Sequence, residues 1–102
     1  MGRRRGPKPD RLIVASLHGI LARRCQVSGP LTEQQRAATL AEIRAETTRP
    51  DLLAEVAGIL LGARGDRLAR DLLVEAGADE SLIEGWADEG QRRMSRAWHS
   101  AP

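Results

Sequence analysis

Two histidines and a single cysteine are the residues of this chain best suited to nucleophilic or metal chemistry. His18 and Cys25 are seven residues apart, so a helix could place both on one face, but about 10 Å apart along its axis. A Cys–His catalytic pair needs hydrogen-bond reach, which is much shorter. Zinc would need further ligands, and His99 has no paired neighbour at ligand spacing. We therefore predict neither a nucleophile pair nor a metal site.

The carboxylates and glycines offer no stronger chemistry. Glu80 and Glu84 lie at the expected start of a helix, where a solvated acidic face is the ordinary explanation. Gly58, Gly62 and Gly65 lack the lysine and the preceding strand of a phosphate-binding loop. We expect a protein with no enzymatic activity, no cofactor and no small-molecule substrate.

The composition favours helices as the elements that position all of these residues. The chain has 102 residues, is 41% hydrophobic, and has two tryptophans as its only aromatic residues. Its core must be aliphatic, and strands prefer β-branched and aromatic residues. We predict an all-α fold: a compact bundle of four to five short helices with a disordered basic N-terminal arm. The expected organisation is an arm at 1–9, a single helical domain at 10–98 and a C-terminal tail at 99–102.

Start and stop signals divide the helical domain. Ser, Thr, Asp and Asn favour the cap before a helix, Pro its first turn, and Gly the position after its end. Gly19, inside the first helix, is interpreted as permitting close contact with another helix. The signals are Asp10 as an N-cap, an end near Gln26, a capping box at Thr32–Gln35, an end near Thr47, a start at Pro50–Asp51, a cap at Asp66, a C′ glycine at Gly77 and a fifth start at Asp79.

Apolar residues at helical spacing indicate the core. The stretch from Leu52 to Leu60 is the most apolar, and we expect it at the centre. The fifth helix is expected to bury Leu82, Ile83, Trp86 and Met94. Trp98 is either a core residue or an exposed anchor for a partner, since Trp and Arg dominate binding hot spots.

Charge is distributed in three blocks. Residues 1–24 carry a net charge of +6, residues 25–91 a net of −7 and residues 92–102 a net of +3. Basic clusters of this kind suit nucleic acid or an acidic partner. The candidate contacts are Arg3, Arg4, Arg5, Lys8, Arg92, Arg93 and Arg96.

Two patterns point towards DNA, and each departs from its type. The arm resembles the AT-hook, a minor-groove tail, but Pro7 stands where that motif has its second Arg. Residues 68–93 resemble a helix-turn-helix, but the would-be recognition helix carries Glu80, Glu84 and Asp88, which would repel phosphates. We interpret this region as two packed helices with a glycine cap.

A reducing cytoplasm suits a chain with one cysteine. No apolar run approaches the 18 or so residues that span a bilayer, so we expect no membrane association. The basic start is followed by an apolar segment that Ser16, His18 and Gly19 interrupt, and we do not interpret it as a signal peptide.

Residues 50–62 (PDLLAEVAGILLG), together with Ala76–Glu80 and Ile83–Trp86, are similar to small uncharacterised all-helical proteins of high-GC bacteria. The resemblance covers roughly residues 40–96. It implies an all-α fold and a bacterial cytoplasm, and it supplies no activity.

The functional prediction is a small bacterial adaptor or regulatory protein that acts through protein–protein contact, with a protein partner or a second copy of itself. The basic arm would add affinity for nucleic acid or an acidic partner. The alternative is a DNA-binding transcriptional regulator that uses the arm and a degenerate helix-turn-helix.

Overall fold

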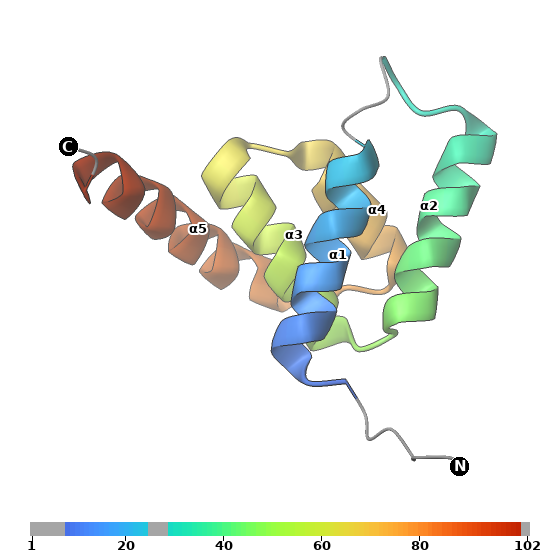
Figure 1. Cartoon of the computed structure of the whole chain (residues 1–102), viewed down its shortest axis with the longest axis horizontal. Coiled ribbons are helices and arrows are strands. Elements are labelled where there is room, and N and C mark those ends of the chain that lie inside the picture. Colours follow the sequence, from blue (N-terminus) through green and yellow to red (C-terminus); the bar gives the residue numbers. More distant parts are fainter. Residues whose placement is uncertain (1–7, 25–28, 101–102) are drawn as a thin grey trace, which may run out of the picture.

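The computed structural model describes residues 8–24 and 29–100, and it confirms the all-α prediction. The described residues form five helices and no strand. The expected contacts Arg3, Arg4 and Arg5, together with Cys25 and the predicted helix end near Gln26, lie outside the described residues. The helices are α1 (Asp10–Arg24), α2 (Glu33–Glu46), α3 (Pro50–Arg64), α4 (Arg67–Ala76) and α5 (Glu80–Ser100), shown in Figure 1.

Local signals set most helix ends. The Thr32 hydroxyl accepts from the Gln35 amide at 3.0 Å, and the Gln35 side chain accepts from the Thr32 amide at 2.9 Å, as a capping box requires. Asp66 caps α4 by accepting from the Ala69 amide. Gly77 ends α4 with a φ of 118°, a left-handed conformation that glycine adopts without a Cβ clash. These three predictions are confirmed.

The start of α1 differs from the prediction by one position. Asp10 is the first helical residue, and the carbonyl oxygen of Pro9 accepts from the amides of Leu12 and Ile13. The Asp10 carboxylate instead pairs with Arg49 at 2.8 Å. Asp10 thus stabilises the first turn by its charge rather than as a cap.

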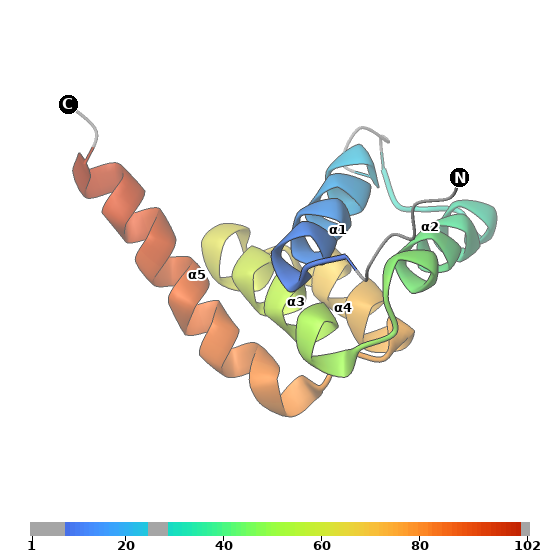
Figure 2. The same ribbon diagram turned by 60° about the horizontal axis from the view of Figure 1, so that its bottom comes forward.

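Helix α3 is the central element, as its apolar sequence predicts. It packs against α1, α4 and α5, while α2 packs against α1 and α4 on the far side (Figure 2). The core is aliphatic. Helix α3 contributes most to it, because nearly all of its residues from Leu52 to Leu60 are buried against three neighbouring helices. Its buried residues are Leu52, Leu53, Ala54, Val56, Ala57, Gly58, Ile59 and Leu60.

Helices α3 and α5 run side by side in the same direction. The amide of Asp79 donates to the carbonyl oxygen of Pro50 at 3.1 Å, so the two helices begin at the same level. Their backbones approach closely through glycines. A Cβ at Gly58 or Gly62 would overlap α5, and one at Gly90 would lie 2.6 Å from the carbonyl oxygen of Ile59.

The prediction that Gly19 permits a close helix contact is wrong. A Cβ at Gly19 would meet only the end of the Arg23 side chain, at 4.0 Å. The close contact lies between α3 and α5, where glycines from two helices meet across the interface.

Among the described residues, no helix combines the length and the hydropathy that crossing a membrane requires.

Candidate functional site

The C-terminal half of α5 projects beyond the rest of the molecule. Helix α3 ends at Arg64, and Gly90 of α5 packs between Ile59 and Ala63 in the last turns of α3. Helix α5 continues for ten further residues, and residues 91–99 are all exposed. Figures 1 and 2 both show this segment leaving the bundle. We call residues 91–100 the overhang.

Large apolar side chains lie exposed on the overhang. Trp98 is 75% exposed and Met94 is 38% exposed. At about 100° per residue, Met94 and Ala97 project within about 40° of Gly90, and Trp98 within about 80°. The face of α5 that packs on α3 therefore continues past the end of α3, where no described residue of the bundle covers it.

The expected buried face of α5 is only partly correct. Ile83 is buried and Trp86 is half-buried, while Leu82 and Met94 are exposed. The prediction failed at Met94 because the periodicity of a helix does not reveal where its neighbour ends. The same reason excludes Trp98 from the core.

The three arginines of the overhang gather around one carboxylate. Arg92 and Arg93 lie 3.0 Å and 2.9 Å from opposite oxygens of Glu89, and Arg96 lies 3.3 Å from the second oxygen. The hydrogen bonds from Arg93 and Arg92 hold the pKa of Glu89 below its ordinary value. One negative charge faces three positive ones, so the cluster keeps a net charge of +2.

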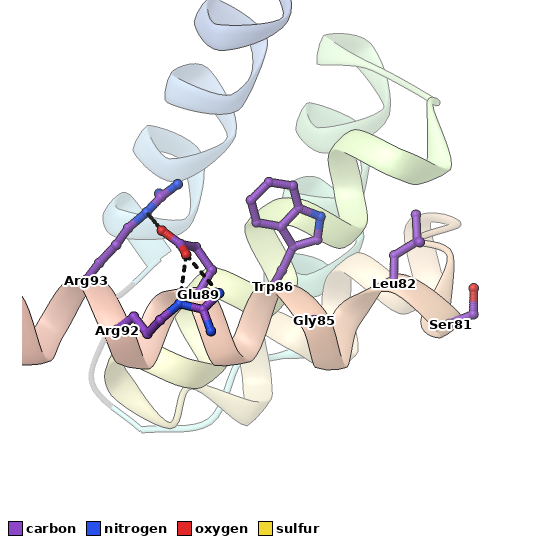
Figure 3. A pocket seen from close by; sticks show the side chains of 7 residues that line it. All are labelled: Ser81, Leu82, Gly85, Trp86, Glu89, Arg92 and Arg93. Carbon is purple, nitrogen blue, oxygen red and sulfur yellow. Dashed lines mark hydrogen bonds and ion pairs between the residues drawn. The ribbon is translucent and has the colours of Figure 1, made fainter.

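A shallow hollow of about 420 Å³ lies along the adjoining face of α5. Figure 3 shows the Trp86 indole standing up from the helix, with Leu82 on one side and the Glu89 cluster on the other. Ser81 and Gly85 complete its floor. Its lining offers one aromatic ring, one aliphatic side chain and paired charges.

Helix α1 adds a histidine to the base of the overhang. His18 is half-buried, and it lies near enough to Arg93 and Arg64 to interact with both charges. Burial is the main cause that lowers the pKa of His18, and the two arginines lower it further. Side chains from α1, α3 and α5 thus bring three basic groups together, a cluster that sequence reasoning missed. No local pattern indicates it, because the residues are far apart in the chain.

The remaining predicted contacts lie elsewhere. Lys8 is held against the bundle, where its ammonium donates to Glu46 at 2.7 Å and to the Ser16 hydroxyl at 3.2 Å. Lys8 thus does not join the overhang arginines, and its ammonium is already paired with Glu46.

Helices α4 and α5, which correspond to the suspected helix-turn-helix, both pack against α3. The first turns of α5 expose Glu80 and Glu84, with Asp88 exposed further along. These acids face solvent where a recognition helix would need to approach phosphates.

The groups considered for catalysis are not gathered into one site. His18 lies on α1, while His99 lies on the overhang with its Nδ1 2.8 Å from the carbonyl oxygen of Ser95. Within residues 8–24 and 29–100, no three His, Asp or Glu side chains are arranged to hold a metal ion.

One ion pair connects the C-terminal end of α1 to the start of α4. Arg24 donates to both carboxylate oxygens of Asp66, at 3.1 Å and 2.9 Å, and its side chain is only 8% exposed. Asp66 therefore caps α4 and fixes the end of α1 with the same carboxylate. This bidentate geometry positions the C-terminal end of α1 beside α4.

No protein-family model, curated protein or solved structure matches the chain.

Proposed function

We propose that the protein is a small non-enzymatic adaptor or regulator that acts by protein–protein contact, and that the overhang of α5 is its contact surface. The basic arm would contribute auxiliary affinity for nucleic acid or an acidic partner. The setting proposed is the cytoplasm of a high-GC bacterium, as the resemblance of residues 40–96 and the single cysteine favour.

One observation carries the proposal: Trp98 is 75% exposed on a helical segment that extends beyond α3. Exposing an indole to water is unfavourable, and contiguous exposed apolar groups mark interaction sites more often than isolated ones do. Met94 lies one turn before Trp98 and extends the apolar surface. Trp and Arg are also the residues most enriched in binding hot spots.

The test is affinity purification with the full chain as bait, comparing wild type, Trp98→Ala and a variant that lacks residues 1–9. The expected result is a defined protein partner that the arm deletion retains and Trp98→Ala loses. Purified components should then reproduce this dependence. Recovery that is indifferent to Trp98 would refute the overhang as the contact surface.

A parallel titration with duplex DNA separates the DNA-binding alternative. A regulator that binds through the arm would show a steep log–log dependence of affinity on salt and lose most affinity on deletion of residues 1–9. We expect no comparable binding at about 50 mM salt, because the exposed acids of α5 repel the duplex. Tight, arm-dependent binding would favour the alternative.

A further inference from the structure

We propose that the overhang, together with His18 of α1 and the C-terminal end of α3, forms a docking surface for an acidic amphipathic helix of a partner protein. This inference rests on the proposed function and assigns the chemistry of the partner. Two properties of the surface define that chemistry: an uncovered apolar strip and a cluster of basic groups beside it.

The apolar strip has the shape that a helix recognises. Met94 and Ala97 continue the face by which α5 packs on α3, and Trp98 lies at the edge of that face. Within the bundle, that face already accommodates a helix through Gly58, Gly62 and Gly90. An incoming helix placed beyond the end of α3 would occupy the position that a longer α3 would have filled. Residues at i, i+3, i+4 and i+7 of a partner helix would supply the matching apolar stripe.

Basic groups lie at the base and along one side of this strip. Arg93 projects about 60° to one side of Gly90 and lies near His18, which also lies near Arg64. Arg64 and the three overhang arginines carry four positive charges, which Glu89 and, near Arg93, Glu55 offset to a net charge of +2. Carboxylates flanking the apolar stripe of the partner would meet this charge, and Arg can bind them in bidentate fashion.

The same charges disfavour the overhang of a second copy as the occupant. Two overhangs placed face to face would bring three arginines against three arginines. Like charges across an interface are destabilising. The apolar strip alone would have to overcome that repulsion.

Nucleic acid and anionic membranes fit less well than a protein helix. Glu89 already neutralises part of the cluster, and Glu84 and Asp88 are exposed on the preceding turns of the same helix. A phosphate-bearing surface that extended around or along α5 would meet the repulsion of these carboxylates. An acidic helix of limited length can contact the overhang without reaching them.

The experiment titrates the full chain into fluorescently labelled synthetic peptides of about 18 residues, roughly five helical turns. One peptide carries Leu at i, i+3, i+4 and i+7 with Glu on its flanks. The matched peptide replaces each Glu with Lys. We expect binding of the acidic peptide and none of the basic one. Equal binding of both would overturn the inference, because charge would then not select the partner.

Variants of the chain test each half of the surface. Arg64→Glu with Arg93→Glu should weaken the acidic peptide at least about tenfold, a difference of about 1.4 kcal/mol. Arg11→Glu with Arg44→Glu makes the same change in net charge at exposed sites outside the surface, and should have little effect.

Trp98→Ala should weaken binding, whereas Leu68→Ala, which truncates a 56% exposed leucine on α4, should not. Glu89→Gln should strengthen binding, because it removes the carboxylate that pairs with all three overhang arginines.

Other occupants would be revealed by three further measurements on the same chain. Trp98-dependent binding of a single-stranded DNA oligomer or of anionic phospholipid vesicles, without binding of the acidic peptide, would overturn the inference. So would Trp98-dependent self-association in sedimentation without peptide. A native protein partner that requires Trp98 but tolerates Arg64→Glu with Arg93→Glu would refute the acidic helix while sustaining the proposed function.

Discussion

A methyl group added at Gly62 would overlap the backbone carbonyl of Ala87, so the glycine is what lets α3 and α5 lie in contact. Gly58 and Gly90 make the same kind of approach on either side of it. The interface depends on backbone proximity more than on large side chains. Its position in turn fixes where the overhang begins.

We therefore predict opposite effects for two glycine substitutions in helices. Gly62→Ala should lower the free energy of unfolding by about 1–3 kcal/mol, the usual cost of overpacking. Gly85→Ala is the matched control, because a Cβ there would meet nothing within 4 Å. Alanine at Gly85 should raise stability by up to about 1 kcal/mol through helix propensity. Urea denaturation followed by circular dichroism measures both, and equal stability of the two variants would contradict the packing.

The Arg24–Asp66 pair gives a second prediction. Asp66→Ala removes the cap of α4 and the partner carboxylate of a nearly buried guanidinium, and should cost about 3–5 kcal/mol. Asp66→Asn should cost less, because asparagine caps helices about as well as aspartate. Glu42→Gln, which breaks the exposed pair with Arg23, should change stability by no more than about 1 kcal/mol. Chemical denaturation of the three variants tests this order, and an equal loss for Asn and Ala would show that the cap contributes nothing.

His18 makes stability depend on pH in a defined direction. Burial, with Arg93 and Arg64, holds its pKa in the folded state below the ordinary 6.5. The unfolded chain therefore takes up the proton first, and stability should fall as the pH drops below about 6.5. Thermal unfolding between about pH 7.5 and pH 5.5 measures the slope.

Two variants check the assignment to His18. His18→Gln should flatten the pH dependence, and Arg93→Gln should make it shallower by removing one of the causes. The range stops near pH 5.5 because burial raises the pKa of Glu55, which acts in the opposite direction at lower pH. A wild-type curve that is flat across the range would contradict the prediction.

Truncating an exposed and a buried apolar residue should have very different effects on the free energy of unfolding. Trp98→Ala should change the free energy of unfolding by no more than about 0.5 kcal/mol, because the side chain is largely solvated. Leu53→Ala, at a fully buried position of α3, should cost about 2–5 kcal/mol. Thermal and urea unfolding test the pair. A large loss of stability in Trp98→Ala would place the indole in the core.

The helices could be predicted from the sequence because their ends are decided locally. The Thr32 capping box, Asp66 and Gly77 each act within three or four residues of themselves. The aliphatic core followed from composition, and the central place of α3 followed from its continuous apolar stretch.

The candidate site could not be predicted in the same way. Whether Met94 and Trp98 are covered depends on where α3 ends in space, which no pattern in α5 contains. The approach of His18 to Arg93 joins residues 75 positions apart. Gly62, considered at first for phosphate binding, serves instead to bring two helices together.

The bond between Asp79 and Pro50 places the starts of α3 and α5 together, so α5, with 21 residues against 15 in α3, extends past the end of α3 as the overhang. Packing on α3 and the proposed contact surface thus occupy successive halves of one helix. Substitutions at Ile83, Ala87 and Gly90 are constrained by α3, whereas those at the exposed positions 93–98 are not. The length and sequence of the overhang could therefore change to suit another partner without altering the packing of the helical bundle.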